Sequence, residues 1–214
     1  MKKTLLILGI TTAIVFSACK TETTITTNYN SSSLRIDTVR NLIADSVIGS
    51  GQMGPYGYGK FTFYSLRTNS IVPNTDSLTT NWDLAFKGTT IRVNCGTSGI
   101  GNGGAYVYSG LYGNLKTIDV NSIKKDTTGA NAIPIGSGNG WYYNVANPIN
   151  LITPIAGRIL AIRTADGKFA KVEILNYYKG GVTPASNASD SIKAFDSRYY
   201  TFRYSYQPNG TPNF

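Results

Sequence analysis

Short runs in which apolar and polar residues alternate make up most of the chain. The clearest run is 198–207, RYYTFRYSYQ, in which the even-numbered positions from Tyr200 to Tyr206 are all aromatic. The odd-numbered positions include Thr201, Arg203 and Ser205. A period of two residues is that of a β-strand, in which successive side chains point to opposite faces. The run therefore predicts a strand whose aromatic face packs across neighbouring strands.

Further runs with strand character are 60–66, 85–94, 105–112, 158–164 and 169–177. The last two flank Asp166 and Gly167, and an Asp-Gly pair between alternating runs is the strongest short-range signal of a β-hairpin. Turns rich in Gly, Asn and Pro separate the runs, which favours antiparallel pairing over βαβ units. The sequence thus predicts an all-β fold, a single antiparallel β domain over residues 34–214. Little helix is expected, and only 38–46 suits a short one.

The first residues have the pattern of an export signal. Lys2 and Lys3 precede an apolar stretch, 5–16, that is too short to span a hydrocarbon core of about 30 Å. The next residues, Phe16-Ser17-Ala18-Cys19, resemble the cleavage box of bacterial lipoproteins, with Phe in place of the usual Leu. Residues 1–18 are therefore predicted to be a lipoprotein signal peptide. In the alternative, an ordinary signal peptide, Cys19 is accidental.

Cleavage at this box would make Cys19 the N-terminus and the site of lipidation. A thioether-linked diacylglycerol and an amide-linked acyl chain such as palmitate together give stable membrane anchoring, where one chain would not. Residues 19–33 are rich in Thr, Ser and Asn, and we expect a lipidated flexible tether there. The membrane is thus a predicted partner, through lipid on Cys19.

The composition removes several classes of active site. The chain has 214 residues and no His, which excludes a Ser-His-Asp triad, a Cys-His dyad and a His-ligated metal site. Its two Cys cannot form a disulfide framework or a cysteine zinc cluster. The net charge of +9 comes from residues spread along the chain, and export argues against nucleic acid as a partner. We therefore expect a binding protein and not an enzyme.

Three local features have structural explanations. The Gly-rich loop 96–104 lacks the strand-then-helix context of a nucleotide site, and we expect a tight loop with several positive φ angles. Cys95 has no partner once Cys19 is acylated, so we expect a buried free thiol. Asp83 follows Trp82 and is expected to be a buried capping or turn carboxylate, not a catalyst.

Tyrosine is the unusual component of the chain, with 15 residues. Tyr108 and Tyr112 lie in one aromatic run, and Tyr142 and Tyr143 follow Trp141. Because tyrosine joins an apolar ring to a polar tip, it lines pockets for flat ligands and glycans. Cross-strand packing is the other explanation for such residues, and at Tyr142 and Tyr143 both stay open.

Several segments, taken together, resemble the HmuY family of haem-binding lipoproteins, over roughly 60–207. The resemblance implies a mostly β protein of the outer membrane, lipid-anchored at the cell surface. Such a protein picks up haem outside the cell and delivers it to an outer-membrane receptor. The segments are Asn81-Trp82-Asp83-Leu84-Ala85-Phe86, Arg92-Val93-Asn94-Cys95-Gly96, Ser98-Gly99, Gly103-Gly104-Ala105, Gly140-Trp141, Arg158, Arg163, Ala165-Asp166-Gly167, Ala170-Lys171-Val172 and Thr201-Phe202-Arg203-Tyr204-Ser205-Tyr206.

The resemblance also implies a ligand pocket, and there the chain departs from the family. The best-known members hold haem iron between two His, and a gap-free alignment puts one of these ligands at Ala146, which cannot bind iron. Protein haem ligands are His, Met, Cys or Tyr, which leaves Tyr142, Tyr143 or Met53 for the metal. The candidate pocket residues are Trp141, Tyr142, Tyr143, Asn144, Ala146, Tyr108 and Tyr112.

The sequence leaves three functions open. The first is a surface lipoprotein that binds haem, as non-covalent b-type haem, or a related tetrapyrrole for uptake. Basic side chains would pair with its propionates and aromatic side chains would cover its ring. The second is a docking or structural lipoprotein that has lost haem binding. The third is a glycan-binding module.

Replacing Cys19 by Ala tests the predicted anchor. We expect Cys19→Ala to abolish lipid attachment and to leave soluble or uncleaved protein, because the acylated sulfur is gone. Detergent partitioning and the mass of the intact protein measure this. If Cys19→Ala still partitions into detergent with an unchanged mature mass, the chain is not a lipoprotein.

Overall fold

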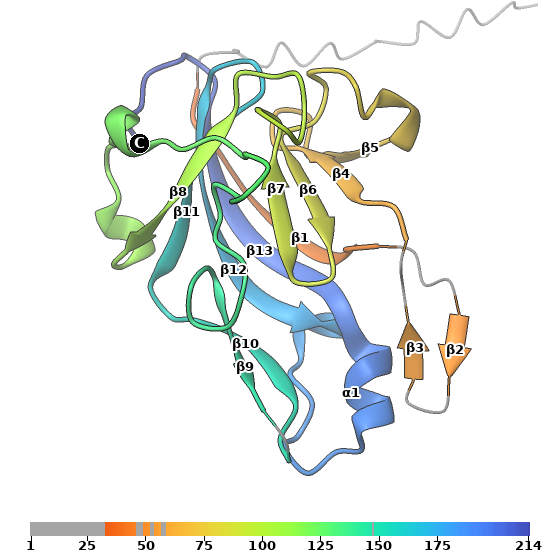
Figure 1. Cartoon of the computed structure of the whole chain (residues 1–214). Helices are drawn as coiled ribbons and strands as arrows, with labels where there is room; N and C mark the ends of the chain where they lie inside the picture. The colour runs from red at the N-terminus through yellow and green to blue at the C-terminus, as the bar shows by residue number, and fades with distance from the viewer. Residues whose placement is uncertain (1–32, 46–48, 52–53, 57–58, 147) are drawn as a thin grey trace, which may run out of the picture. The chain divides into compact units, whose positions relative to one another are not determined.

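Two antiparallel sheets pack face to face around a shared core (Figure 1). The structure is a computed structural model, and it describes residues 33–45, 49–51, 54–56, 59–146 and 148–214. The predicted signal peptide 1–18, the lipidation site Cys19 and the candidate ligand Met53 lie outside the described residues. No helix in the described part of the chain is both long and apolar enough to cross a membrane.

The larger sheet has five strands, and the alternation in the sequence correctly identifies most of them. Its spatial order is β1-β13-β12-β11-β8, and every neighbouring pair is antiparallel. β8 and β1 are therefore its two edge strands. The strands are β1 (Arg35–Ile43), β8 (Gly104–Ser109), β11 (Arg158–Arg163), β12 (Phe169–Tyr178) and β13 (Ser197–Gln207).

The smaller sheet has the order β5-β4-β6-β7 and covers one face of the larger one. Two separate two-stranded ladders, one short α-helix and four 3-10 turns complete the described elements. The four-stranded sheet contains β4 (Thr62–Ser65), β5 (Ser70–Val72), β6 (Leu84–Lys87) and β7 (Thr90–Val93). The remaining elements are β2 (Gly49–Gly51), β3 (Gly54–Tyr56), β9 (Tyr142–Val145), β10 (Leu151–Pro154), α1 (Asp190–Asp196) and the 3-10 turns η1 (Asn74–Asp76), η2 (Tyr112–Asn114), η3 (Val120–Ser122) and η4 (Lys179–Gly181).

The period of two residues sorts each central strand into two apolar faces. On β11, Leu160 and Ile162 enter the main core between the sheets, whereas Ile159 and Ala161 enter a second cluster on the opposite face. Each buried aliphatic side chain contributes about 1.5–3 kcal/mol relative to exposure, so both faces stabilise the sheet. The five-stranded sheet therefore lies between two apolar layers, and alternate residues of its central strands face different layers.

The aromatic face predicted for the last strand, β13, is confirmed. Tyr200, Phe202, Tyr204 and Tyr206 are all buried in the main core, at 0–3% exposure. The expected hairpin is also confirmed, because β11 pairs with β12 around the turn at Gly167, whose φ is +81°. Together these features confirm an all-β, antiparallel fold with one short α-helix.

The short helix expected at 38–46 is wrong. Residues 35–43 form β1, and along Ile36, Asp37, Thr38 and Val39 the exposure alternates as in a strand. Pairing with β13 gives this segment a ladder partner, and this tertiary pairing outweighs a weak helix propensity. The actual helix, α1, lies at 190–196 and was not expected from the sequence.

The helix α1 was missed because it is short and has no apolar stripe facing a core. It has seven residues, and its hydrophobic side chains Ile192 and Phe195 are about half exposed. Its one sequence signal is the N-cap Ser189, whose hydroxyl oxygen accepts from Ile192 N at 3.4 Å. A single cap residue is too common a signal to predict a helix by itself.

The Gly-rich loop 96–104 is tight, but not for the reason expected from the sequence. Only Gly96 in this loop has a positive φ, +56°. Gly99 and Gly101 are required for close packing around Asn94. A Cβ on Gly99 would lie 2.1 Å from Asn94 Oδ1, which already accepts from Gly101 N at 2.9 Å. The loop is thus part of the packing and has no phosphate-binding geometry.

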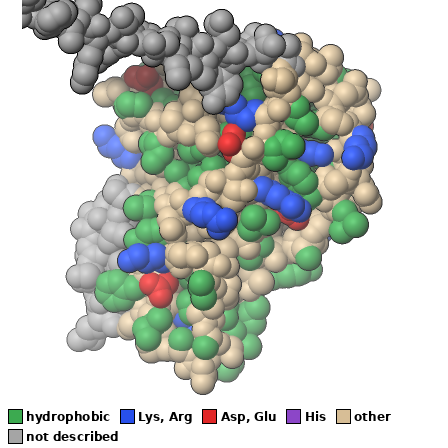
Figure 2. All heavy atoms as spheres, turned by 180° about the vertical axis from the view of Figure 1, so that it is seen from behind, with side chains coloured by type: hydrophobic (Ala, Val, Ile, Leu, Met, Phe, Trp, Pro, Cys, Tyr) green, Lys and Arg blue, Asp and Glu red, His purple; other side chains and the backbone are tan. Residues whose placement is uncertain are grey.

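Cys95 and the charged surface agree with the expectations. Cys95 is a free cysteine with 0% exposure, and burial raises the pKa of its thiol. Lys and Arg side chains are scattered over the face in Figure 2, among apolar and uncharged ones.

Asp83 is the buried carboxylate that the sequence led us to expect. It is 5% exposed, and its oxygens accept from Leu66 N at 2.8 Å and from Ala165 N at 3.0 Å. These bonds join the end of β4 to the β11–β12 turn, and so join the two sheets. Burial raises the pKa of Asp83 to about 6, against the lowering effect of the two backbone N–H groups.

This raised pKa predicts a pH dependence of the free energy of unfolding. A carboxyl whose pKa is higher in the folded state adds stability below pH about 4, and that stability is lost as the pH rises through about 6. From pH 4 to pH 7, the native protein should therefore lose roughly 2–3 kcal/mol of its free energy of unfolding relative to Asp83→Asn. Urea unfolding of both proteins measures it, with Asp196→Asn as the control carboxylate. A shift in favour of the native protein would contradict the burial effect.

Candidate functional site: a cationic cavity beside β8

One long connection, residues 110–141 between β8 and β9, forms most of the candidate site. Its regular elements are only the short turns η2 and η3. Connections of this length without strands or α-helices are usually either functional or disordered. Here buried side chains and backbone pairing attach the connection to both sheets, so that it can form a fixed cavity wall.

The carboxylate of Asp126 fixes the middle of the connection. It is 1% exposed, and it accepts from Val93 N in β7 at 3.2 Å and from Ala132 N at 2.7 Å. Gly96 permits this approach, because a Cβ there would lie 1.9 Å from the carbonyl oxygen of Asp126. Charge-assisted bonds to a carboxylate are roughly twice as strong as neutral ones. Asp126 thus holds Ala132, a cavity residue, to the smaller sheet.

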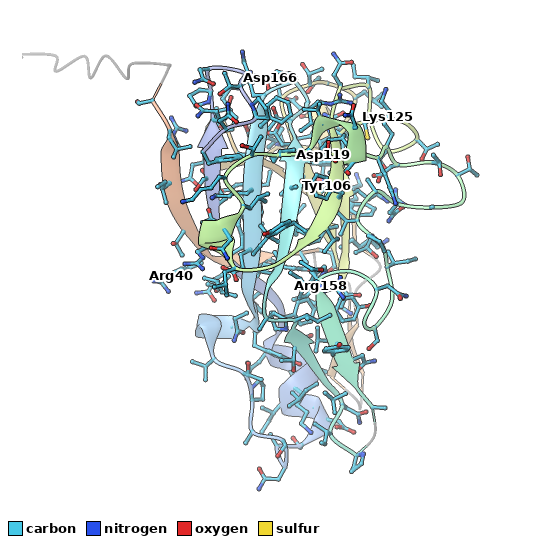
Figure 3. The ribbon with its side chains drawn as sticks, turned by 90° about the vertical axis from the view of Figure 1, so that its left-hand side faces the viewer. Arg40, Tyr106, Asp119, Lys125, Arg158 and Asp166 are labelled. Atoms are coloured by element: carbon cyan, nitrogen blue, oxygen red, sulfur yellow. The ribbon has the colours of Figure 1, made fainter. Side chains whose placement is uncertain are left out.

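The first half of the connection pairs with the edge strand β8. Lys124 and Ala105 exchange two backbone hydrogen bonds of 2.9 Å, as in an antiparallel ladder. Asp119 N donates to the hydroxyl oxygen of Tyr106 at 3.1 Å, and Figure 3 shows these two residues side by side. The Tyr106 oxygen is therefore an acceptor inside the protein, and its own hydrogen stays available for donation.

The second half of the connection packs on β9. Gly138 N donates to Tyr142 O at 2.8 Å, and Asn144 N donates to Ser137 Oγ at 2.8 Å. The ring of Tyr143 lies against Gly138, where a Cβ would come within 3.3 Å of it. The β9 segment thus positions the loop that carries Pro134 and Asn139, two further cavity residues.

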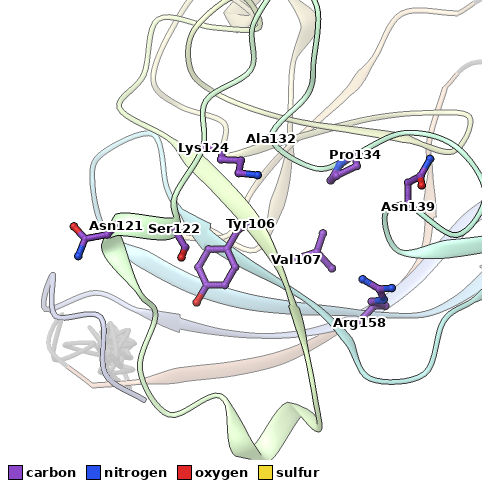
Figure 4. Close-up of a pocket in the computed structure, with 9 residues that line it drawn as sticks. All are labelled: Tyr106, Val107, Asn121, Ser122, Lys124, Ala132, Pro134, Asn139 and Arg158. Atoms are coloured by element: carbon purple, nitrogen blue, oxygen red, sulfur yellow. The ribbon is translucent and has the colours of Figure 1, made fainter.

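These contacts enclose a cavity of about 420 Å³ (Figure 4). Ligand sites are usually about 300–1,000 Å³, so the cavity can hold a small molecule or one part of a larger one. Figure 4 shows Tyr106 and Arg158 on β8 and β11, with Lys124 on the connection. The lining residues are Tyr106, Val107, Asn121, Ser122, Lys124, Ala132, Pro134, Asn139 and Arg158.

The cavity carries two cations that no described acidic side chain neutralises. Neither Lys124 nor Arg158 takes part in an ion pair within the described residues, and no lining residue is acidic. The carboxylate of nearby Asp119 is engaged by Ser122 Oγ at 2.6 Å and Asn121 N at 3.0 Å, and these bonds lower its pKa. Two such cations give the cavity a preference for anionic groups.

The edge of β8 adds backbone groups to the cavity. Ala105 directs its N–H and C=O toward Lys124, and in an antiparallel ladder the residue two positions on directs its groups to the same side. Val107 therefore presents its N–H and C=O away from β11, and no described segment pairs with them. A ligand at this edge would find a backbone donor and acceptor beside the two cations.

This set of groups suits the binding of an anionic ligand. An Arg, a Lys and a tyrosine hydroxyl suit carboxylate oxygens, and the Tyr106 ring suits a flat apolar face. Ser122 lines the cavity, and its Oγ donates to Asp119 Oδ2 at 2.6 Å at the turn η3. The buried carboxylates Asp83 and Asp126 are occupied by backbone N–H groups.

The candidate residues predicted from 141–146 occupy three environments. Trp141 is buried, with Nε1 donating to Thr89 O at 3.0 Å, and the buried Tyr142 accepts at its hydroxyl from Thr89 Oγ1 at 3.1 Å. Tyr143 and Asn144 are exposed on β9. Ala146 is exposed beyond the end of β9, where its carbonyl accepts from Ile149 N at 3.0 Å.

Tyr108 and Tyr112 lie on the opposite face of the larger sheet from Trp141 and Tyr142. Both pack on the second cluster, whereas Trp141 and Tyr142 belong to the main core. The Tyr112 hydroxyl lies 2.8 Å from Ser205 Oγ. The structure therefore does not bring the predicted pocket residues together as one group, and their contact with a ligand stays a prediction.

The described residues do not match the ligand set of a haem iron held at two strong-field positions. No group of three or more His, Cys, Asp or Glu that could hold a metal occurs among them. Cys95 is fully buried, and the hydroxyl of Tyr142 is engaged with Thr89. Tyr143 is accessible but is not among the cavity residues. Tyr106 is the one described cavity residue of a haem-ligand type, and its hydroxyl oxygen already accepts from Asp119 N at 3.1 Å.

Comparisons with known proteins give structural likenesses only. No family model and no curated protein matches the chain. Solved structures do match, and two of the three described next are HmuY-like, the family that the sequence resembles. With TM-scores below 0.5, these likenesses carry no argument about what the chain binds.

The three structures come from two bacterial genera. An HmuY-like protein from Bacteroides vulgatus, to which heme binding is ascribed, has 14% identity and a TM-score of 0.46, covering 81% of this chain and 92% of its own. A Bacteroides fragilis protein ascribed to the lipoproteins has 18% identity and a TM-score of 0.43, covering 79% and 88%. An apo HmuY analogue from Tannerella forsythia has 14% identity and a TM-score of 0.43, covering 83% and 97%.

Sequence reasoning missed the residues that line this cavity. Lys124 and Arg158 lie far apart in the chain, and the short run Lys124-Lys125-Asp126 does not by itself indicate a site. Arg158 was noted only as part of the family resemblance. Their convergence depends on the path of the connection 110–141, for which the alternation pattern gives no signal. Of the cavity residues, Tyr106 gave the best sequence signal, because it lies in the aromatic run of the predicted strand 105–112.

Proposed function

We propose that this protein is a non-catalytic, exported binding protein whose β8 cavity holds the carboxylates of a planar ligand of the tetrapyrrole class. The observation that carries the proposal is the pair of unneutralised cations, Lys124 and Arg158, in a cavity without an acidic lining residue. The sequence resemblance to HmuY proteins supplies the ligand class.

The carboxylates bring most of the binding free energy in this proposal. Hydrogen bonds to charged groups contribute about 1.5–3 kcal/mol when they are partly shielded from water, and Arg158 is half-buried. Lys124 is exposed, so its contribution is smaller. Tyr106 adds a hydroxyl donor and part of an aromatic face, and Val107 adds apolar contact.

The metal contributes little in this proposal, because no strong-field ligand lines the described cavity and the Tyr106 oxygen is engaged by Asp119 N. The iron of a bound haem would stay high-spin, and a metal-free porphyrin with the same carboxylates would bind about as well. In the wider proposal the chain is lipid-anchored at Cys19 in an outer membrane and passes its ligand to a receptor there.

Titration with haemin and with metal-free protoporphyrin IX tests this function. We expect both to bind with affinities within a few-fold of each other, and haemin to give a high-spin absorption spectrum. Arg158→Gln should weaken both about tenfold and Lys124→Gln a few-fold, since each removes a charge partner of the carboxylates. Absorption and fluorescence titrations measure the affinities.

Lys125→Gln is the matched control, because Lys125 is the exposed neighbour of Lys124 and is not a cavity residue. It should bind both porphyrins as the native protein does. If Lys124→Gln and Lys125→Gln weaken porphyrin binding equally, the effect of Lys124 comes from the general surface charge and not from the cavity. A tight, low-spin haemin complex, or no binding of either porphyrin, would refute the proposal.

A further inference from the structure

A second cavity of about 400 Å³ lies where β10, α1 and the adjoining ends of β12 and β13 meet. None of its lining residues is shared with the β8 cavity. Figure 1 shows the β9–β10 hairpin and α1 beside these strand ends. The lining residues are Thr89, Asn150, Ile152, Tyr177, Tyr178, Asp190, Lys193, Ala194, Ser197 and Arg198.

An irregularity in β12 gives this cavity its aromatic floor. The register of β12 against β13 shifts on both sides of Asn176. Because of this bulge, the consecutive residues Tyr177 and Tyr178 both face the main core, where strict alternation would place one of them outside. Bulges commonly redirect side chains next to binding sites.

The two tyrosines differ in one decisive respect. The Tyr178 hydroxyl accepts from Ile152 N at 2.8 Å, which ties β12 to β10. The Tyr177 side chain is 4% exposed, and its hydroxyl makes no hydrogen bond to any described residue. Burial raises the pKa of Tyr177 well above its ordinary value, so the group is a neutral donor. Tyr177 lines the cavity, so a ligand there would supply a hydrogen-bond acceptor for this hydroxyl.

The charged groups around the cavity neutralise one another. Arg198 Nη1 lies 3.4 Å from Oδ2 of the buried Asp45, and Lys193 Nζ lies 3.7 Å from Asp190 Oδ1. Asn150 Nδ2 donates to both oxygens of Asp190, at 3.1 and 3.2 Å. The cavity therefore offers many polar atoms without an excess of either charge, unlike the β8 cavity.

Two cavity residues have strained backbones. Asn150 has φ +48° and Arg198 has φ +72°, both in the left-handed region that favours glycine. The left-handed backbone costs more free energy at Arg198 than at Asn150. A short Asn side chain often compensates with a local hydrogen bond, which a long Arg side chain does not make. Such strain concentrates at ligand sites, where the surroundings hold it in place.

We propose that this cavity binds the neutral, hydroxyl-rich end of a saccharide. A sugar presents hydroxyls that both donate and accept, which matches the paired amide, carboxylate and guanidinium groups and the Tyr177 hydroxyl. Tyr177 donates to a sugar oxygen, and Asp190 and Asn150 accept from and donate to its hydroxyls. A charged ligand would have to break the two ion pairs.

Saccharide binding to the purified full chain tests the proposal. The probes are glucose, galactose, mannose and N-acetylglucosamine as neutral sugars, with glucuronic acid as the charged comparison, followed by saturation-transfer NMR and calorimetry. We expect at least one neutral sugar to bind and glucuronic acid to bind at least tenfold more weakly. Tyr177→Phe should weaken the binding about tenfold, because it removes a hydroxyl donor that no described residue engages.

Tyrosine variants separate a binding role from a packing role. Tyr177→Phe should leave thermal stability unchanged or slightly higher, since the hydroxyl has no partner among the described residues, whereas Tyr178→Phe should lower it by breaking the bond to Ile152 N. Tyr143→Phe, on the exposed strand β9, is the control and should bind sugar normally.

The result also distinguishes the two cavities. Arg158→Gln should keep native saccharide binding, because Arg158 lines only the β8 cavity. If no neutral sugar binds, if Tyr177→Phe binds as well as the native protein, or if Arg158→Gln removes the binding, the proposal is wrong. None of these outcomes depends on whether porphyrins bind.

Discussion

The candidate site depends on one buried carboxylate, that of Asp126. It joins β7, through Val93 N, to Ala132 in the long connection between β8 and β9. Without that joint Ala132 would lose its bond to the carboxylate, and residues 132–139 would be held by β9 and by the main core, which Ala132 and Ile133 enter. Removing one partner of a buried charged group is costly, because the others stay desolvated. Buried hydrogen bonds to the Asp126 carboxylate thus help to hold the cavity wall, while no described acidic side chain pairs with the cavity cations.

The architecture could be predicted from the sequence because each central strand has a clear period. RYYTFRYSYQ identifies β13, and Asp166-Gly167 identifies the β11–β12 hairpin, before any tertiary contact is known. β1 could not be predicted in the same way. Its residues carry few large apolar side chains, and its strand conformation comes from pairing with β13. The helix α1 could not be predicted because its apolar residues are half exposed, which removes the periodic signal.

The sites were harder to predict than the fold, for two physical reasons. Tyr108 and Tyr112 pack on one face of the larger sheet, whereas Trp141 and Tyr142 belong to the core on its other face. Aromatic residues that looked like one pocket are therefore separated by the sheet. In addition, the bulge at Asn176 turns Tyr177 toward the opposite face from the one that strict alternation predicts, and no local sequence pattern indicates this. Residues such as Lys124 and Arg158 converge only through an irregular connection, and irregular backbone is where sequence periodicity carries no information.

The position of a porphyrin on the protein tests the central claim most directly. A crystal structure of the chain with protoporphyrin IX should show a propionate within hydrogen-bonding distance of Arg158, beside Lys124 and Tyr106, at the free edge of β8. A porphyrin lying instead over the exposed β9 residues Tyr143 and Asn144, with its propionates away from Arg158, would contradict the account.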